Sequence, residues 1–383
     1  MNANSFDAIV LGGGTMGSAA AWALSRGGKK TLVLEQFGHI HERGSHGGKT
    51  RILRHAYAES PAYVPLVQRA DELWHHLERE TGNRIFIRCG GLEMAAPGHN
   101  HARDAKQSAV EHGLAFEWLT AAEGRTRWPM IAIPDDWDLF VDPQAGFVLT
   151  EPALQGMMGM AVRLGAVLHE HELALDWGAS DDGAWVRTET ATYRAATLII
   201  AAGAWAASVL SVLDLPLQVR RKTLWWLAVD DPDLYAPERF PVFIADSDLG
   251  QIYGFPVING LSLKIADHAG GQVTSADLIQ PPAVDKESLN VRSLATSLFP
   301  GVTGRIVDRS VCLYTMTPDA HFVVDRHPSH GNVVVACGFS GHGFKFAPAI
   351  GELAARLADN PTEQTPPILS IDRLIPLDRL DPR

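Results

Sequence analysis

The chain has 383 residues, enough for about two domains. Hydrophobic residues make up 46% and charged residues 20% of it, which is typical of globular proteins and not of disordered or fibrous ones. The formal net charge is −11, and the sequence contains no local basic cluster. We therefore expect neither nucleic acid nor an anionic membrane surface as a partner.

The three cysteines, Cys89, Cys312 and Cys337, are far apart and form no CxxC pair, so neither a disulfide framework nor a cysteine zinc site is expected. The first residues lack the basic segment and cleavage site of a signal peptide. The uncharged stretch 195–213 is long enough for a membrane span, but Gly203 interrupts it. We predict a strand, a turn and a helix there, and a cytoplasmic protein.

The first part of the chain predicts a βαβ unit. The apolar run 8–11 is too short for a helix and suits a buried strand. A helix is expected over 18–25, ended by the glycines at 27–28, and a second strand over 31–34. Units of this kind form parallel sheets with right-handed crossovers.

Gly12, Gly14 and Gly17 form a GxGxxG motif between that strand and that helix. The first glycine permits a tight turn, the second lets a pyrophosphate approach the backbone, and the third lets the helix pack on the strand. Glu35 ends the second strand, where an acid binds a ribose and disfavours the 2′-phosphate of NADP. The motif alone does not distinguish FAD from NAD. Its place at the start of the chain, with no second GxGxxG, favours FAD.

The later segments predict further units of the same kind, separated by sheet-like material. We expect a helix over about 61–79, a second strand–turn–helix at 198–213, several strands over 225–272, and a strand, glycine loop and helix over 332–358. Turns are expected at Gly254, Gly260, Gly270 and Gly271. This order predicts two domains interleaved in the sequence: an FAD-binding domain of residues 1–85, 145–213 and 305–383, and a substrate domain of residues 86–144 and 214–304.

Three segments resemble the family of monomeric sarcosine oxidases and N-methyltryptophan oxidases. They are residues 44–57 (GSHGGKTRILRHAY), 312–319 (CLYTMTPD) and 338–346 (GFSGHGFKF). With the N-terminal motif and the segment around Lys264, the resemblance covers essentially the whole chain. It implies an α/β fold in which a glutathione-reductase-like FAD-binding Rossmann domain is interleaved with a smaller mixed β-sheet substrate domain.

The resemblance also implies roles for single residues. Cys312 matches a cysteine that forms a thioether to the flavin 8α-methyl group, and the alternative is a buried, inert thiol. Lys264 matches a lysine beside the flavin that promotes electron transfer to oxygen, and the alternative is a solvent-exposed strand position. Arg51 matches an arginine at the flavin face, where a positive charge stabilises the anionic reduced flavin.

Substrate binding needs a cation for the amino-acid carboxylate, and Arg54 and Lys345 match the family's residues for it. Tyr253 and His268 match residues that line the substrate pocket. The candidate catalytic residues are Lys264, Arg51, His268 and Tyr253. The candidate cofactor-binding residues are Gly12, Gly14, Thr15, Met16, Gly17, Glu35, Ser45, His46, Thr50, Arg51, Gly203, Cys312, Gly341, Gly343 and Lys345. The histidine spacing indicates no metal site.

The implied reaction oxidises an N-methyl amino acid, sarcosine first, to glycine and formaldehyde, and reduces O2 to hydrogen peroxide, with no obligate protein partner. Other secondary amino acids are the alternative: N-methyltryptophan, proline, pipecolate or a larger N-alkyl amino acid. The run 314–322 looks closer to sarcosine oxidases, and the run 264–273 closer to N-methyltryptophan oxidases. A dehydrogenase that uses a protein or quinone acceptor, or a non-catalytic FAD-binding protein, are further hypotheses. An absence of peroxide would support the first, and a flavin that no amine reduces would support the second.

Overall fold

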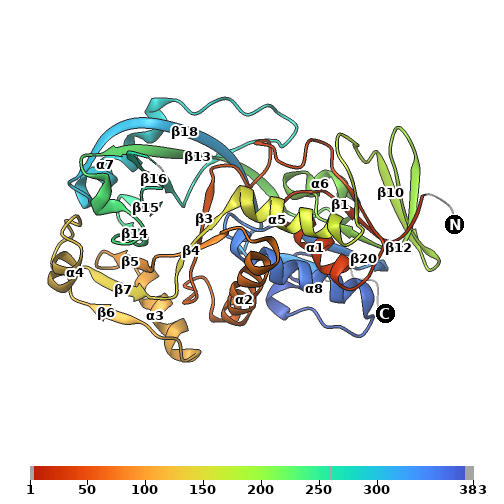
Figure 1. Cartoon of the computed structure of the whole chain (residues 1–383), viewed down its shortest axis with the longest axis horizontal. Helices are drawn as coiled ribbons and strands as arrows, with labels where there is room; N and C mark the ends of the chain where they lie inside the picture. Colours follow the sequence, from red (N-terminus) through yellow and green to blue (C-terminus); the bar gives the residue numbers. More distant parts are fainter. Residues whose placement is uncertain (1–3, 259, 376–383) are drawn as a thin grey trace.

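The structure of the chain is a computed structural model that describes residues 4–258 and 260–375. The protein has two lobes, seen side by side in Figure 1. Two long strands, β13 (Gln218–Val229) and β18 (Val302–Met316), pair antiparallel over most of their length. They run from the far end of one lobe toward the other and so connect the two.

The first lobe is built on an eight-stranded sheet with a parallel centre. The strands are β1 (Ser5–Leu11), β2 (Thr31–Leu34), β9 (Val167–His169), β10 (Asp176–Ser180), β11 (Gly183–Arg187), β12 (Thr192–Ile200), β19 (Val323–His327) and β20 (His330–Cys337). The order β9–β2–β1–β12–β20 is parallel throughout. The remaining three strands pair antiparallel: β11 with the first residues of β12, β10 with β11, and β19 with β20.

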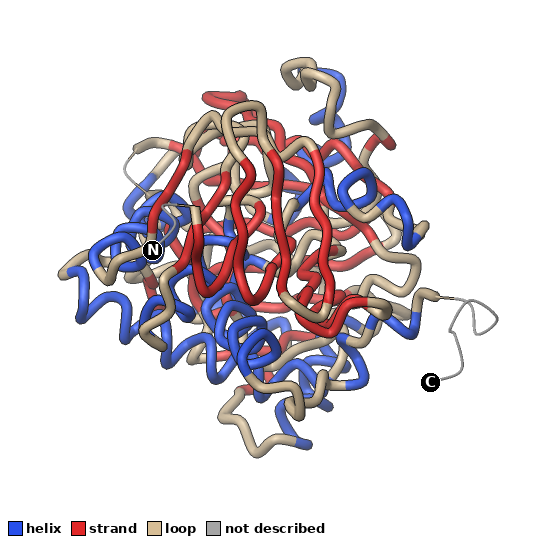
Figure 2. The backbone as a smooth tube through the Cα atoms, turned by 90° about the vertical axis from the view of Figure 1, so that its right-hand side faces the viewer, coloured by secondary structure: helices blue, strands red, loops and turns tan. Residues whose placement is uncertain are grey.

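Helices cover one face of this sheet, as Figure 2 shows from the end of the lobe. They are α1 (Thr15–Arg26), α2 (Val64–Thr81), α5 (Thr150–Arg163) and α8 (Ala347–Asp359). Val10, Val33 and Val334 point into the core beneath these helices, while their neighbours Ile9 and Leu32 belong to the core on the other face. Because both faces are covered, the central strands are apolar at every position rather than at alternate ones.

The second lobe is built on a nine-stranded, mainly antiparallel sheet. Besides β13 and β18 it contains β5 (Gly91–Ala95), β6 (Glu117–Leu119), β7 (Asp138–Asp142), β14 (Val242–Ser247), β15 (Gly250–Phe255), β16 (Ser262–Asp267) and β17 (Gln272–Val273), with helices α3 (His101–Glu111), α4 (Ala121–Arg127) and α7 (Leu289–Leu298). A three-stranded sheet of β3 (Thr50–Leu53), β4 (Phe86–Arg88) and β8 (Gly146–Leu149) accompanies them. The predicted fold, a parallel-sheet part interleaved with a mixed sheet, is confirmed; the domain boundaries stay a proposal.

Two local predictions were wrong. The helix expected after Gly203 is divided into η2 (Gly203–Trp205), α6 (Ala206–Val209) and η3 (Ser211–Leu213). Gly254 lies inside β15 instead of at a turn. A Cβ atom there would lie 2.3 Å from the ring of Phe243, so this glycine makes room for a core side chain.

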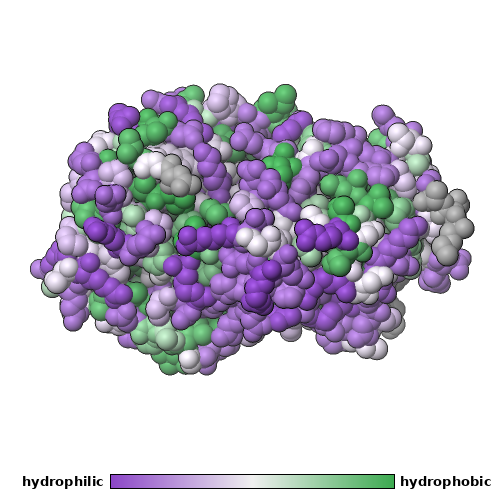
Figure 3. Space-filling model, in the orientation of Figure 1, coloured by the Kyte–Doolittle hydropathy of each residue, from purple (hydrophilic) through white to green (hydrophobic). Residues whose placement is uncertain are grey.

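The stretch 195–213 forms the end of β12 and these short helices. No helix among residues 4–258 and 260–375 is long and apolar enough to cross a membrane. On the face shown in Figure 3, hydrophobic residues lie in separate patches among hydrophilic ones.

Candidate active site

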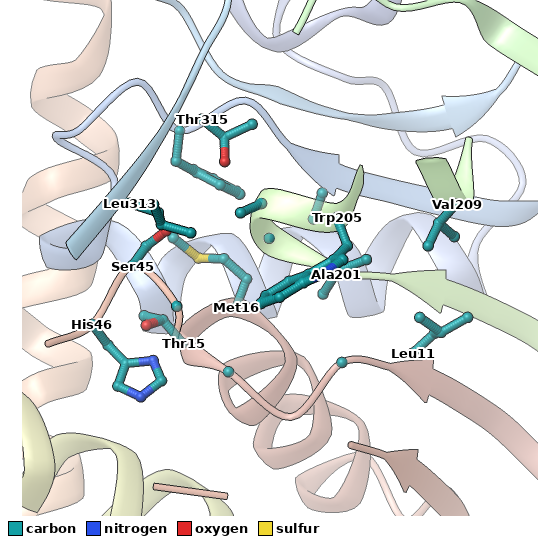
Figure 4. Close-up of a pocket in the computed structure, with 18 of the residues that line it drawn as sticks. Leu11, Thr15, Met16, Ser45, His46, Ala201, Trp205, Val209, Leu313 and Thr315 are labelled. Atoms are coloured by element: carbon teal, nitrogen blue, oxygen red, sulfur yellow. The ribbon is translucent and has the colours of Figure 1, made fainter. Parts of the chain in front are cut away.

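A cavity of about 370 Å³ lies at the carboxyl ends of the parallel strands. Leu11, Leu34 and Ala201, which end or follow β1, β2 and β12, line it. Figure 4 shows Met16 and Trp205 side by side in the middle of this space, with Leu313 on the β18 side. Open α/β sheets bind their ligands at this edge, where neighbouring crossovers diverge.

The GxGxxG turn forms one wall of this cavity. A Cβ atom at Gly12 would lie 2.5 Å from the carbonyl oxygen of Ala201, and one at Gly17 only 1.7 Å from the carbonyl oxygen of Gly12. At Gly14, by contrast, a Cβ atom would meet nothing within 4 Å. Gly14 precedes α1, and no side chain caps the first N–H groups of that helix. The cavity therefore has room and unpaired N–H donors where a pyrophosphate would lie.

Glu35 lies at the other side of the same turn and is 4% exposed. Its Oε2 accepts from the backbone N–H of Gly13 at 2.7 Å, and its Oε1 accepts from that of Phe37 at 2.8 Å. Burial raises the pKa of the carboxyl, against these hydrogen bonds. Glu35 lines the cavity, and its oxygens have further lone pairs that can accept from a ligand hydroxyl.

The cavity contains most of the predicted cofactor residues and fits an FAD molecule. Those that line it are Gly12, Gly14, Thr15, Met16, Glu35, Ser45, His46, Arg51, Gly203, Gly341 and Gly343. Gly17, Thr50, Cys312 and Lys345 are not part of its lining. Gly17 packs the helix on the turn, and Lys345 lines a second cavity.

The second cavity, of about 60 Å³, adjoins the first. Four residues line both cavities: Arg51, Tyr314, Gly341 and Phe344. Arg51 donates to the carbonyl oxygens of Thr50 and Ser45 at 2.8 and 2.6 Å. A ligand in the second cavity therefore lies directly beside one end of a ligand in the first.

Arg54 lines the second cavity and is 4% exposed. Its Nη2 donates to both carboxylate oxygens of Glu59 at 2.7 Å, and its Nε lies 3.8 Å from Glu93. Burial alone would lower the pKa of Arg54, but the two carboxylates outweigh it and raise this pKa. Burial likewise opposes the charged form of Glu59, yet Arg54 holds the pKa of Glu59 well below its usual range.

Lys345 lies in the same cavity and is 6% exposed. Its Nζ donates to the carbonyl oxygen of His342 at 2.9 Å and to the Tyr57 hydroxyl at 3.2 Å. That hydroxyl lies 2.6 Å from Nδ1 of His342, whose Nε2 donates to the carbonyl oxygen of Ala320. Burial lowers the pKa of Lys345 to about 7.

Tyr253 and His268 also line the second cavity, as predicted. Their rings meet edge to face at 6.1 Å, and the hydroxyl of Tyr253 lies 3.4 Å from that of Tyr314. Burial raises the pKa of Tyr253 to about 12 and lowers the pKa of His268 to about 3. Both groups are therefore neutral at pH 7.

Lys264 lines neither cavity, and it is not solvent-exposed either: only 3% of it is accessible, so the exposed alternative was wrong. Its Nζ donates to the carbonyl oxygen of Thr50 at 2.9 Å, to the hydroxyl of that residue at 3.0 Å, and to the carbonyl oxygen of Gly48. Burial, with Arg51 nearby, places the pKa of Lys264 well below its ordinary value.

Cys312 is 2% exposed, on β18 and opposite Lys222 of β13. Burial raises the pKa of its thiol, while Arg51, Lys264 and Lys222 oppose that rise. Cys337 is a buried core residue, whereas Cys89 is only half-buried.

Sequence reasoning did not identify several residues of the second cavity. They are Glu59, His101 and Gln251, with Glu93 behind them. Glu59 is only five positions from Arg54, so an acid beside a candidate arginine was a usable signal. The other three come from β5, α3 and β15, and no local pattern connects these elements.

The FAD dependent oxidoreductase family (DAO) matches residues 7–357 of the chain. The monomeric sarcosine oxidase of Bacillus sp. (strain B-0618) is 37% identical over 96% of each protein. The N-methyl-L-tryptophan oxidase of Salmonella agona (strain SL483) is 35% identical over 92% of this chain and 94% of its own. The solved structure of NikD, described as an unusual amino acid oxidase essential for nikkomycin biosynthesis, has a TM-score of 0.83 at 23% identity and covers 97% of this chain and 98% of its own; it supports the fold.

Proposed function

This chain belongs to the FAD dependent oxidoreductase family, and we propose that it oxidises N-methyl amino acids, with sarcosine as the first candidate substrate. The relatives named for N-methyl amino acids match nearly the full chain and support the reaction class. Bound FAD supplies the two-electron acceptor for oxidation of the C–N bond and passes the electrons to O2. The enzyme acts on the CH–NH group of its donor, and the choice of sarcosine is the proposal.

The observation that carries the proposal is the pair of adjoining cavities. The small cavity shares Arg51, Tyr314, Gly341 and Phe344 with the cavity that fits FAD. It also contains Arg54, a buried guanidinium that already pairs with the carboxylate of Glu59 through Nη2 and can bind a ligand carboxylate in the same way. An amino acid bound there by its carboxylate keeps its α-carbon and nitrogen at the shared boundary.

Size supports a small substrate. The second cavity has about 60 Å³ of free space, and drug-sized ligands occupy cavities of roughly 300–1,000 Å³. Sarcosine is much smaller than N-methyltryptophan, so the free space favours sarcosine.

A panel of amino acids tests the substrate assignment. We expect the kcat/KM for peroxide formation to be highest for sarcosine and at least about tenfold lower for N-methyl-L-tryptophan, L-proline and L-pipecolate; each tenfold step corresponds to about 1.4 kcal/mol. Glycine, which lacks the N-methyl group, is the matched control. A larger kcat/KM for one of the bulkier amines would overturn sarcosine and leave the reaction class unchanged.

Lys264 and Cys312 keep their roles as proposals, Lys264 in the reaction with oxygen and Cys312 in a thioether to FAD. The cationic surroundings of Cys312 support the second role, since Arg51, Lys264 and Lys222 favour its thiolate.

Acid precipitation tests the thioether. Flavin should stay with the wild-type protein after acid treatment and go into the supernatant from Cys312→Ser. Cys337→Ser, another buried cysteine, is the matched control and should retain its flavin. Flavin retention by Cys312→Ser would rule out the link.

A further inference from the structure

Lys345 is a buried cation-forming group without an acidic partner in direct contact. Two of the three protons of its ammonium form are directed to oxygens, those of His342 and Tyr57. Within residues 4–258 and 260–375, no carboxylate oxygen lies within 4 Å of its Nζ. Arg54 differs, because Glu59 holds its guanidinium at 2.7 Å. The third Nζ position is therefore available to a ligand in the cavity that Lys345 lines.

We propose that Lys345 is the base that takes a proton from the ammonium group of the bound amino acid. The inference rests on the proposed function, since it requires an amino acid in this cavity. An amino acid in neutral water is a zwitterion, and its ammonium nitrogen has no lone pair to support oxidation. In the step proposed here, one N–H bond of the substrate ammonium breaks and one N–H bond forms at Nζ of neutral Lys345. One proton moves, and no electrons are exchanged.

The direction of this transfer follows from the charges around Nζ. Burial lowers the pKa of Lys345 to about 7, with Arg54 and Arg51 acting in the same sense and Glu59 and Glu93 against it. Neutral lysine is thus present at the start. A substrate carboxylate arriving beside Nζ stabilises protonated lysine, while the same arginines destabilise the substrate ammonium. Both effects move the proton from substrate to Lys345.

All the elements around Lys345 contribute to this balance. The charged and titratable groups around it are Arg51, Arg54, Tyr57 and Glu59 from β3 and the segment after it, Glu93 from β5, His101 from α3, Tyr253 from β15, His268 after β16, Tyr314 from β18, and His342 three residues before Lys345. None of them is a carboxylate in direct contact with Nζ. The product of the transfer, a lysine ammonium beside the substrate carboxylate, supplies the cation predicted at this position from the sequence.

Four other titratable groups of the cavity are poor proton acceptors. Burial opposes the charge on Glu59, but Arg54 outweighs it and holds the pKa of this carboxyl well below its usual range. His342 uses both ring nitrogens in hydrogen bonds, and burial lowers its pKa to about 4. Burial lowers the pKa of His268 to about 3 and raises that of Tyr253 to about 12. Of these five groups only Lys345 has a pKa near neutrality, where a base is most effective.

Proton uptake during ligand binding tests the inference without turnover. The probe is (methylthio)acetate, in which sulfur replaces the sarcosine nitrogen, so that the ligand has a carboxylate and no amine. Its binding to the flavin-loaded enzyme at pH 8 is measured by calorimetry in buffers of different ionisation enthalpy. We expect wild type to take up about one proton per ligand, because neutral Lys345 is protonated beside the carboxylate. Lys345→Met and Lys345→Arg should take up none.

The pH profile of sarcosine oxidation gives a second readout. In wild type the substrate supplies the proton, so kcat/KM should change less than twofold between pH 7 and 9. In Lys345→Met and Lys345→Arg only the free amine is productive, so kcat/KM should rise about tenfold per pH unit. A lysine with a merely structural role would not change this slope, and the flavin spectrum and Tm show whether each variant is folded.

Three results would overturn the inference. Binding of (methylthio)acetate to wild type without proton uptake excludes a neutral Lys345. A flat pH profile in Lys345→Met and Lys345→Arg shows that another group takes the proton. If wild type neither binds the probe nor oxidises sarcosine, the proposed function is wrong and the inference falls with it.

Discussion

At the scale of single residues, the substrate cavity is organised by Arg54 and the acids around it. Both carboxylate oxygens of Glu59 accept from Nη2 of Arg54 at 2.7 Å, and Glu93 lies at 3.8 Å from Nε. A substrate carboxylate therefore competes with a carboxylate that the protein itself supplies. If the substrate binds there as proposed, one carboxylate partner replaces another and the buried arginine stays paired.

Arg54→Met tests this arrangement through two separate quantities. The KM for sarcosine should rise about 10- to 100-fold, since hydrogen bonds to charged groups contribute about 1.5–3 kcal/mol. The free energy of unfolding should fall by about 3–5 kcal/mol, because Glu59 and Glu93 lose their partner in a buried site. Enzyme kinetics and urea unfolding measure the two effects.

The double variant Arg54→Met/Glu59→Gln separates these effects. It should recover much of the lost stability, because one unpaired carboxylate is gone, and it should keep the high KM. A KM that returned to the wild-type value would show that Arg54 does not bind the substrate.

At the scale of elements, the packing of α1 against α8 holds the glycine turn at Gly12 and Gly14 in place at the FAD cavity. Gly351 of α8 lies against α1, where a Cβ atom would come within 2.3 Å of the backbone carbon of Ala19. This contact holds the start of α1, and with it the turn at Gly12 and Gly14, against the end of the sheet.

Gly351→Ala should lower the free energy of unfolding by about 1–3 kcal/mol, although alanine is the better helix former, because the two helices must move apart. Gly159→Ala is the matched control. Gly159 is an exposed glycine of α5 whose Cβ atom would meet nothing within 4 Å, and its replacement should raise stability by about 0.5–1 kcal/mol. If both variants raised the free energy of unfolding by the same amount, α1 and α8 would pack less closely than described.

The elements also show how far sequence reasoning extends. The turn at Gly12 and the acid at Glu35 form a local βαβ unit, so their spacing predicted the FAD cavity. The single helix expected after Gly203 is three short helical segments in the structure. An apolar, alanine-rich composition favours helix but does not show where a helix is interrupted, so the sequence could not predict the breaks. A glycine between apolar residues usually predicts a turn, and so Gly254 was assigned to one. The structure shows another reason for this glycine: the ring of Phe243 on the neighbouring strand needs the space that a side chain would fill.

Only part of the substrate cavity was predicted, because some of its residues come together only when strands far apart in the sequence pair. Arg54 and Lys345 stood in segments that resemble a known family, whereas Glu93, His101 and Gln251 meet only through the pairing of β5, β14 and β15. Pairings of this kind depend on the whole sheet. No spacing within the sequence encodes them.

At the scale of the whole molecule, the candidate active site lies where the two lobes meet. The parallel-sheet lobe supplies the glycine turn, Glu35 and the loop with Lys345. The mixed-sheet lobe supplies Tyr253 and Gln251 of β15. An arrangement of this kind holds the cofactor in one lobe and covers the substrate with the other, which excludes water from the reacting atoms.

The most direct test of this account is anaerobic mixing of the flavin-loaded enzyme with sarcosine while the flavin absorbance is recorded. Rapid bleaching of the yellow colour is expected, and its return with one hydrogen peroxide per flavin when air is admitted. A flavin that stays oxidised with sarcosine and with every other secondary amino acid would show that the enzyme does not oxidise N-methyl amino acids.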